Sequence, residues 1–241
     1  MRKKIFGQWI NDISIKNFSE LEIIKNSKGF NFIVTPNLQH IVELNRSPKL
    51  RDCYNNACIS LCDSRIIALL SRMFGNKILN VVPGSDLTKY FFEKVFREND
   101  SIMVVGSTET EVEFLKKKYS LNNLVHCDPT MGFIKNLDEI EKVINTIEII
   151  KPRYLFLAVG FPRQEQLACL IKSRVFFDCT AFCIGASIDF LTGKQKRSPV
   201  IWQKLHLEWF YRFLQEPDRL FRRYFIDSWG IIGLIIKEFK Q

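Results

Sequence analysis

Long apolar runs are missing from this chain of 241 residues. A membrane-spanning helix needs about 18–20 consecutive apolar residues, and no segment reaches that length. The nearest approach, residues 229–236, is too short to cross and could either lie in a membrane interface or pack on the body of the protein. Residues 1–7 carry basic side chains with no long apolar stretch behind them. We therefore expect neither a transmembrane helix nor a signal peptide.

Spacings typical of metal sites are also missing. The seven cysteines, at positions 53, 58, 62, 127, 169, 179 and 183, form no C-x-x-C pair, and the histidines at 40, 126 and 206 show no ligand spacing. No D-x-D motif of the kind that holds a nucleotide-bound cation occurs. We therefore expect no metal site, and cysteines that stay reduced as small apolar residues of a cytoplasmic protein. A bound nucleotide diphosphate would then need arginines and helix N-termini to neutralise it.

Nucleic-acid motifs are absent as well, although the formal net charge is +9. Such a charge favours polyanionic partners, which include nucleic acid, anionic lipid and phosphorylated substrates. No zinc-finger spacing and no RRM-like aromatic motif supports the first of these. Because the charge is concentrated beside aromatic residues at one end of the chain, a membrane surface or a diphosphate is the better interpretation.

The densest pattern in the chain is a basic, aromatic block over residues 194–225. It contains eight Lys or Arg residues against three Asp or Glu, interleaved with large apolar side chains. Apolar positions 207, 210, 211 and 214 recur at helical spacing, and we expect Pro217 to start a second helix that carries residues 220, 221 and 224 on one side. The block fits either a solvated helix face or a helical pair on an anionic membrane, and its many aromatic rings favour the membrane.

Upstream of this block, apolar runs alternate with helical patterns. Strands are expected over residues 30–35, 58–62, 101–105, 125–127 and 154–159, with further β-rich runs at 175–178 and 182–185. Helices are expected over residues 38–44, 48–55, 64–74, 87–96, 109–118, 137–150 and 164–173. This order predicts an α/β fold with a Rossmann-like, mostly parallel sheet and helices on both faces. We place a main domain at residues 1–193 and a C-terminal helical, membrane-associating appendage at residues 194–241.

In parallel sheets of this kind the ligand binds beyond the carboxyl ends of the strands. Polar residues and glycines lie at this rim: Thr35, Asn37, Asp63, Gly106, Gly132, Gly160 and Gln164. Asp63 could act as a general base for an acceptor hydroxyl, or it could cap the helix that starts at Ser64, and its position does not decide between the two. Asp86 has the same ambiguity, with a stronger case for capping because residues 87–96 are helical in pattern.

Two short loops enter helices, at residues 106–108 and 160–164. The N-terminus of a helix has unpaired N–H groups and a positive dipole end, which suit a nucleotide diphosphate. Neither loop is a Walker A motif or a complete G-x-G-x-x-G, and the turn after Thr35 is not glycine-rich. The missing glycines count against a dinucleotide-dependent oxidoreductase, which stays the alternative enzyme class.

The motifs occur in the order found in the WecG/TagA/CpsF glycosyltransferases, which the sequence resembles from about residue 30 to residue 227. The matching segments are Thr35-Pro36-Asn37, Asp63, residues 83–87, 160–165, 185–190 and 196–199, and the block with Leu207-Glu208-Trp209, Arg212, Glu216-Pro217, Arg219-Leu220 and Arg222-Arg223-Tyr224. The last block is the most specific. Two positions depart from the family pattern. Asp63 is followed by Ser64 instead of Gly, and Val81 replaces an arginine, with Arg65 as the candidate to supply that charge.

The resemblance implies a metal-independent, inverting enzyme that uses no cofactor. It would move an N-acetylmannosamine-type sugar from UDP to a polyprenyl-diphosphate-linked sugar, such as undecaprenyl diphosphate carries, for wall teichoic acid, enterobacterial common antigen or capsule. Asp63 would be the catalytic base, and Gln164 would contact the donor sugar. With the two helix-entry glycines added, the expected substrate-binding residues are Thr35, Asn37, Gly106, Gly160, Gln164, Arg212, Arg219 and Arg222.

By the same resemblance, the appendage would seat the enzyme on the cytoplasmic face of the cell membrane as a peripheral protein. Where that surface is missing, the chain could self-associate as a homo-oligomer. A non-enzymatic membrane-surface scaffold is the rival interpretation, in which the basic helices bind lipid and Asp63 only caps its helix. Release of UDP in the presence of a polyprenyl-diphosphate-linked acceptor would separate these possibilities.

Overall fold

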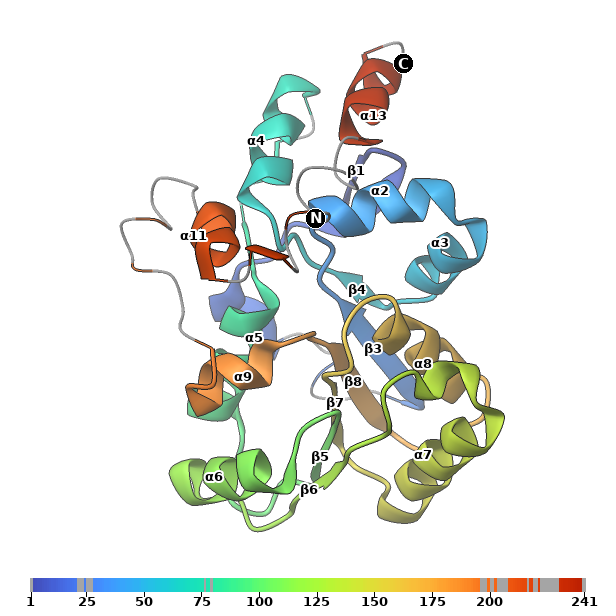
Figure 1. The fold of residues 1–241 in the computed structure, drawn as a ribbon, viewed down its shortest axis with the longest axis vertical. Helices are drawn as coiled ribbons and strands as arrows, with labels where there is room; N and C mark the ends of the chain where they lie inside the picture. Colours follow the sequence, from blue (N-terminus) through green and yellow to red (C-terminus); the bar gives the residue numbers. More distant parts are fainter. Residues whose placement is uncertain are drawn as a thin grey trace.

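A parallel β-sheet forms the centre of the molecule (Figure 1). The computed structural model describes residues 2–20, 24, 28–75, 77–78, 80–195, 199, 202, 208–215, 217–218, 221 and 230–239. Within these residues the strand order is β4-β3-β8-β7-β5-β6, and every neighbouring pair is parallel. The strands span Phe30–Val34 (β3), Ile59–Ser60 (β4), Ile102–Val105 (β5), Leu124–Cys127 (β6), Tyr154–Leu157 (β7) and Cys179–Cys183 (β8). The expected α/β class and parallel sheet are confirmed.

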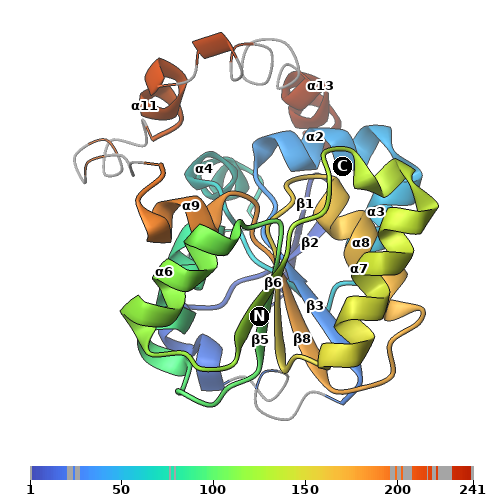
Figure 2. The ribbon, with the colours of Figure 1, turned by 60° about the horizontal axis from the view of Figure 1, so that its bottom comes forward.

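Helices connect the strands and cover both faces of the sheet (Figure 2). They span Leu38–Arg46 (α2), Pro48–Asn55 (α3), Arg65–Met73 (α4), Gly84–Tyr90 (α5), Glu109–Tyr119 (α6), Leu137–Ile150 (α7), Arg163–Lys172 (α8), Ser187–Thr192 (α9), Glu208–Gln215 (α11) and Gly230–Glu238 (α13). Shorter turns of 3-10 or π helix lie at Ile15–Glu20 (η1), Phe91–Val95 (η2) and Phe133–Lys135 (η3).

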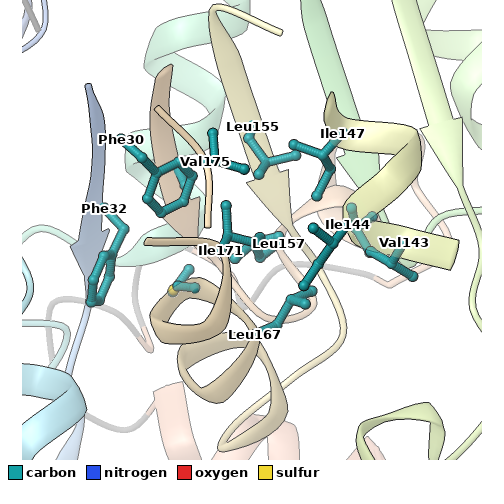
Figure 3. Packing of buried hydrophobic residues seen from close by; sticks show 14 of the residues in the cluster. Phe30, Phe32, Val143, Ile144, Ile147, Leu155, Leu157, Leu167, Ile171 and Val175 are labelled. Carbon is teal, nitrogen blue, oxygen red and sulfur yellow. The ribbon is translucent and has the colours of Figure 1, made fainter. Parts of the chain in front are cut away.

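Two clusters of buried apolar residues hold the helices to the sheet. On one face, α3, α7 and α8 pack onto strand residues such as Phe32 and Leu155 (Figure 3). On the other face, α5, α6 and α9 pack onto Ile33 and Phe156, which directly follow Phe32 and Leu155 in the sequence. Successive strand residues thus point to opposite faces, as the period of two requires. Because helices cover both faces, the strands appear in the sequence as continuous apolar runs.

Most expected elements are confirmed, with ends that move by a few residues, and the helix expected at 137–150 is unchanged as α7. The main difference is the last strand, where the runs at 175–178 and 182–185 are replaced by β8 alone. Phe176 is 89% exposed, and the Asp178 carboxylate accepts the N–H of Gly29 (2.6 Å). Residues 175–178 therefore form the loop that leads into the strand, in which Val175 is buried whereas the apolar ring of Phe176 faces solvent.

An antiparallel hairpin that the sequence patterns did not indicate precedes the sheet. Its strands are β1 (Arg2–Ile5) and β2 (Gln8–Asn11). The hairpin forms a third buried cluster together with α2, α4 and α13. Helix α13 contributes Leu234, and just beyond its end Phe239 contacts the ring of Phe74 edge to face, with 4.8 Å between the ring centroids.

This third cluster decides between the two interpretations of the apolar run near the C-terminus. Gly230 lies so close to α2 that an added Cβ would sit 2.5 Å from Cγ1 of Val42. Residues 230–238 therefore pack on the body of the protein, while Ile232 and Ile236 on the outer side of α13 stay exposed. Among the helices that the structure describes, none combines the length and the apolar content that a membrane span requires.

The seven cysteines are all free thiols, and Cys62, Cys179 and Cys183 are buried. Burial raises the pKa of Cys62 and of Cys179 to about 12. Both thiols are therefore neutral at physiological pH, which confirms their expected role as small apolar residues.

Candidate active site

The carboxyl ends of the strands form one edge of the sheet, where the expected rim residues follow. From β3 the chain continues into α3 on one face, whereas from β4 and β8 it reaches α5 and α9 on the opposite face. In open α/β sheets, ligands bind where neighbouring strands send their connections to opposite faces. Thr35, Asp63 and Gly185, which follow these three strands, therefore mark the candidate site.

Asp63 lies half-buried just beyond the end of β4. Its backbone N–H donates to the carbonyl of Pro36 (3.1 Å), and its carboxylate accepts the N–H of Gly84 at the start of α5 (3.4 Å). The cap of α4 is Ser64, whose hydroxyl accepts the N–H of Ile67 (3.2 Å). The alternative in which Asp63 caps α4 is therefore wrong, and the carboxylate contacts a different element at the sheet edge.

Asp86 does not cap its helix either. The N-cap position of α5 is Pro83, which makes no side-chain capping bond, and Asp86 lies inside the first turn. A carboxylate there still stabilises the helix through the helix dipole. Among the described side chains, no group of three or more His, Cys, Asp and Glu residues is placed to hold a metal ion.

Thr35 and Asn37 follow the end of β3, and both make hydrogen bonds that shape this edge of the sheet. The Thr35 hydroxyl is buried and donates to the carbonyl of Cys183 at the end of β8 (3.3 Å). The Asn37 side chain accepts the N–H of His40 (3.2 Å) and so caps α2. Asn37 is half-buried, which leaves it nearer to solvent than Thr35.

The start of α5 packs tightly between these groups. An added Cβ at Gly84 would lie 3.2 Å from the hydroxyl oxygens of both Thr35 and Ser187, and 3.4 Å from the carbonyl oxygen of Ile184. A larger residue would push α5 away from the strand ends. Glycine at this position therefore lets α5, whose first N–H binds the Asp63 carboxylate, approach β3 and the turn after β8.

Gly106 joins the ends of three neighbouring strands. It follows β5, has φ +98, and an added Cβ would lie 2.7 Å from Cγ1 of Val159 and 3.1 Å from the carbonyl carbon of Ala158, both just after β7. Its N–H donates to the carbonyl of Cys127 in β6 (2.8 Å). Both the backbone conformation and the close approach require glycine.

We expect Gly106→Ala to lower the free energy of unfolding by about 3–4 kcal/mol, because backbone strain and overpacking each cost about 1–3 kcal/mol. Gly132→Ala is the matched control: its φ is +86, but an added Cβ would meet nothing within 4 Å. The control should lose only about 1–2 kcal/mol. Urea unfolding of both variants measures the difference, and equal losses would show that β5 and β7 are not in tight contact here.

The two loops expected to hold a diphosphate differ in their helix N-termini. At α6, Thr108 and Glu111 form a capping box, and Glu109 adds a second carboxylate to the first turn. At α8, the N-cap residue Pro162 makes no side-chain capping bond, and the first-turn residue Glu165 is fully buried, which raises its pKa to about 7 and disfavours its negative charge. Because carboxylates repel an anion and a capping side chain uses the N–H groups, the N-terminus of α8 is the better anion site.

Gln164 lies behind the rim and not on it. Its side chain is buried, Oε1 accepts the N–H of Gly185 (2.8 Å), and Nε2 donates to Oε1 of Glu165 (2.9 Å). Both ends of the amide are therefore bonded to protein groups. Where the sequence suggested contact with a donor sugar, the structure places Gln164 inside the protein, holding the turn after β8.

Glu165 is the centre of a buried polar network. Its Oε1 also accepts a hydrogen bond from the hydroxyl of Tyr54 (3.1 Å), which lies 2.9 Å from Nδ1 of His40. The Glu165 side chain is fully buried, and its Oε2 has no hydrogen-bond partner among the described residues. Burial raises the pKa of Glu165 to about 7, against the opposing effect of the bonds from Gln164 and Tyr54.

This raised pKa predicts a pH-dependent stability. The pKa of an unfolded glutamate is about 4.3, so between that value and the native pKa the folded state binds more protons. The free energy of unfolding should therefore fall as the pH rises from about 4 to about 7, by roughly 3–4 kcal/mol in total, and then level off. Glu165→Gln cannot ionise and should remove this contribution. Identical unfolding profiles of the two proteins between pH 5 and pH 8 would show that Glu165 does not titrate in this range.

The C-terminal arginines cannot be placed at the site from the described residues. Helix α11 confirms a helix near residues 207–214, and in both views it lies on the side of the molecule that carries α4 and α9 (Figures 1 and 2). Arg212 belongs to α11, but its side chain lies outside the described residues, as do Arg219 and Arg222 entirely. The helix expected after Pro217 also lies mostly outside them, so these assignments stay predictions.

Sequence reasoning missed the buried network, although a signal for it was present. Gln164 and Glu165 stand at helical spacing from Leu167, Ala168 and Ile171, which are all buried on α8. A polar pair on an apolar helix face is expected only where partners satisfy it. Those partners come from α2, α3 and the turn after β8, and no local pattern identifies them.

Comparison with known proteins extends over nearly the whole chain. The model of the family described as "Glycosyl transferase WecG/TagA/CpsF family" matches residues 3–241. One similar protein is the N-acetylglucosaminyldiphosphoundecaprenol N-acetyl-beta-D-mannosaminyltransferase of Staphylococcus aureus (strain MW2), which is 26% identical over 223 residues, covering 87% of this chain and 85% of the relative. The protein of the same name from strain MRSA252 is 25% identical over 222 residues, with the same coverage.

Proposed function

Since the chain belongs to the WecG/TagA/CpsF glycosyltransferase family, we propose that it transfers an N-acetylmannosamine-type sugar from UDP to a polyprenyl-diphosphate-linked sugar. Family membership makes the protein a glycosyltransferase. The names of the two Staphylococcus aureus relatives support the finer choice of sugar and acceptor. The product would serve bacterial cell-surface polysaccharide synthesis, of which wall teichoic acid, enterobacterial common antigen and capsule are examples.

The position of Asp63 is the observation that carries this proposal. The carboxylate lies at the strand edge, contacts the start of α5, and is not used to cap α4. In the proposed reaction Asp63 takes the proton from the acceptor hydroxyl as the oxygen attacks the anomeric carbon. The bond from that carbon to the diphosphate breaks, and UDP leaves with the electron pair. A single displacement of this kind inverts the anomeric configuration and needs no metal ion in the proposed scheme.

The donor would lie across the carboxyl edge of the sheet. Thr35 and Asn37 follow the end of β3, and Gly160 leads into α8, whose N-terminus has no side-chain cap and suits the diphosphate. Gly106 keeps the neighbouring strand ends close enough to form one continuous rim. In this scheme Arg212, Arg219 and Arg222 supply the remaining positive charge, because arginine holds phosphate oxygens in two parallel bonds and stays ionised.

The proposed association with a membrane depends on the appendage at residues 194–241. Its basic, aromatic composition suits an anionic lipid surface, where a polyprenyl-linked acceptor is anchored. We therefore propose a peripheral enzyme at the cytoplasmic face of the membrane. Without that surface, the apolar residues of the appendage would be free to contact a second copy and form a homo-oligomer.

A direct test is release of UDP by the purified protein. We expect release from UDP-N-acetylmannosamine only when an N-acetylglucosaminyl-diphospho-polyprenol is present, and little from other UDP-sugars. A non-enzymatic membrane scaffold would bind anionic vesicles and release no UDP with any donor. A dinucleotide-dependent oxidoreductase would instead bind NAD and leave UDP-sugars unchanged.

A further inference from the structure

A line of hydrogen bonds crosses the interior from α2 to the turn after β8, and the proposed reaction gives it no role. Its members are His40, Tyr54, Glu165, Gln164 and Gly185, which come from α2, α3, α8 and the turn after β8. The four side chains are all buried, at 6%, 5%, 0% and 2% exposure in that order. Bonds this deep in the protein are shielded from water and hold their partners in fixed positions.

The direction of each bond follows from the groups that take part. The hydroxyl proton of Tyr54 is donated to Oε1 of Glu165, so its oxygen accepts from Nδ1 of His40, which fixes the tautomer of the ring. The backbone N–H of Gly185 can only donate, which turns Oε1 of Gln164 toward it and Nε2 toward Glu165. The bonds on both sides therefore point toward Glu165, whose Oε1 accepts from Tyr54 and from Gln164.

At its first end the line reaches the loop that leads into α8. The His40 ring stacks on Phe161, with 3.9 Å between the ring centroids and an angle of 11° between the planes. Phe161 follows Gly160 in the loop whose helix N-terminus is the better anion site. The backbone N–H of His40 is also bound by Asn37. A change in the position of His40 would therefore move Asn37 and Phe161, which lie on both sides of the place proposed for the sugar nucleotide.

At its other end the line reaches the contacts of Asp63. Gly185 sits in the turn between Ile184 and Ser187, and both of these residues pack against Gly84. The N–H of Gly84 is the group that the Asp63 carboxylate accepts. The contacts from Glu165 to Asp63 are thus continuous, through a bond at Gly185 and the packing of α5.

We propose that His40, Tyr54 and Glu165 are positioning residues, whose hydrogen bonds hold the loop at Phe161 and the turn at Gly185 where the donor nucleotide and Asp63 require them. The proposal rests on the transferase reaction proposed above. None of the three side chains has to touch the substrate. They act through Gln164 at one end and the Phe161 ring at the other.

The network lowers the stability of the core, which argues that its role is to fix the positions of the elements that it joins. A buried carboxylic group with one unpartnered oxygen destabilises a core, whereas an apolar residue of the same length would not. Such a group is expected to persist where it fixes one arrangement of several elements. Here it fixes α2, α3 and α8 relative to the turn after β8.

Three variants separate positioning from general stability. Glu165→Met keeps the length of the side chain and removes the acceptor, Glu165→Gln keeps the Oε1 acceptor, and Tyr54→Phe removes one donor at nearly constant volume. For each we would measure kcat and KM with UDP-N-acetylmannosamine and a short-chain N-acetylglucosaminyl-diphospho-polyprenol. Hydrogen exchange at the Gly185 amide, measured on the protein without substrates, gives a second readout that does not depend on activity.

We expect Glu165→Met to lower kcat/KM by about 10- to 100-fold, because small displacements of positioned groups have effects of this size. Exchange of the Gly185 amide should be about 10-fold faster, as for the loss of a supporting hydrogen bond. Tyr54→Phe should show both effects more weakly. Glu165→Gln should stay within about threefold of the wild type in both measurements, since its amide oxygen replaces the accepting atom.

Three results would overturn the proposal, of which the first two are wild-type exchange at Gly185 in Glu165→Met and a Glu165→Gln variant as impaired as Glu165→Met. A merely structural role would lower the fraction of folded protein and leave kcat and KM per folded molecule unchanged, which also overturns it. Failure of the proposed reaction looks different. The wild type would then transfer no sugar from any UDP donor, while faster exchange at Gly185 in Glu165→Met would still show that Glu165 holds this turn.

Discussion

Replacement of Asp63 by Asn is expected to lower turnover by about 10²–10⁴-fold, because a hydroxyl is a poor nucleophile at neutral pH without a positioned base. The amide has nearly the same shape and can still accept the N–H of Gly84, a bond of 3.4 Å in the wild type. The fold and the affinity for UDP should therefore change little. Steady-state transfer assays give the turnover, and calorimetric titration with UDP gives the affinity.

Two neighbouring residues provide the controls for this result. Ser64→Ala removes the cap of α4 and should cost about 1 kcal/mol of unfolding free energy with turnover nearly unchanged. Asp86→Asn removes a carboxylate from the first turn of α5, and it should lower the free energy of unfolding by a few tenths of a kcal/mol. If Asp63→Asn instead loses stability as Ser64→Ala does and keeps its specific activity, Asp63 is not the base.

The sheet could be predicted well because its signals are local. Each buried strand is a short apolar run followed by a polar residue or glycine, and each helix has its own periodic face, as α7 illustrates. Such patterns arise from burial on both faces of a parallel sheet. The last strand was misplaced because Val175, Phe176 and Phe177 form an apolar run in a loop, and the exposure of Phe176 cannot be inferred from composition.

In the candidate site, only the residues that directly follow a strand could be predicted from the sequence. Asp63, Thr35 and Gly106 were found because they follow β-rich runs, and the structure places them at one edge. The capping question was open in the sequence, since Asp63 and Ser64 are adjacent and both residue types cap helices well. Only the backbone geometry assigns the cap to Ser64.

The position of Gln164 shows why the remaining part of the site could not be predicted. A helix start beside a strand end suggested a side chain on the rim, but whether it points outward depends on the partners that compete for it. Those partners are Glu165 next to it and Gly185, 21 residues farther along the chain. Long-range bonds of this kind appear only when the elements are assembled, and they decide which polar residues remain for a substrate.

Truncation after Lys194 is expected to abolish nearly all transfer, by about 10³-fold or more, while the sheet still forms because β8 ends at Cys183. The missing segment contains the three arginines proposed to neutralise the diphosphate, and loss of a single such group typically costs about 10²–10³-fold. The truncated protein should also bind anionic vesicles poorly, because each lost basic residue near the surface is worth about 1 kcal/mol.

The structure adds a complication that the experiment has to separate. Truncation removes α13, whose Leu234 packs with Ile41 and Ile67 in the third buried cluster, so stability and self-association will change as well. Leu234→Ala in the full chain is the matched control. It should lose about 2–3 kcal/mol of unfolding free energy and keep its specific activity, because the arginines remain.

Arg219→Glu in the full chain then distinguishes catalysis from recruitment to the membrane. If Arg219 binds the diphosphate, this variant should transfer about 10²-fold more slowly even at saturating acceptor and with a water-soluble acceptor analogue, where no membrane is needed. If the arginines only attract the lipid surface, both Arg219→Glu and the truncated protein should recover full activity with the soluble analogue. In that case the difference in transfer rate between Arg219→Glu and the wild type on anionic vesicles would shrink at high salt, because interactions between exposed charges are screened beyond about 10 Å at 0.1 M. The rate with the soluble analogue therefore decides whether the appendage is part of the active site.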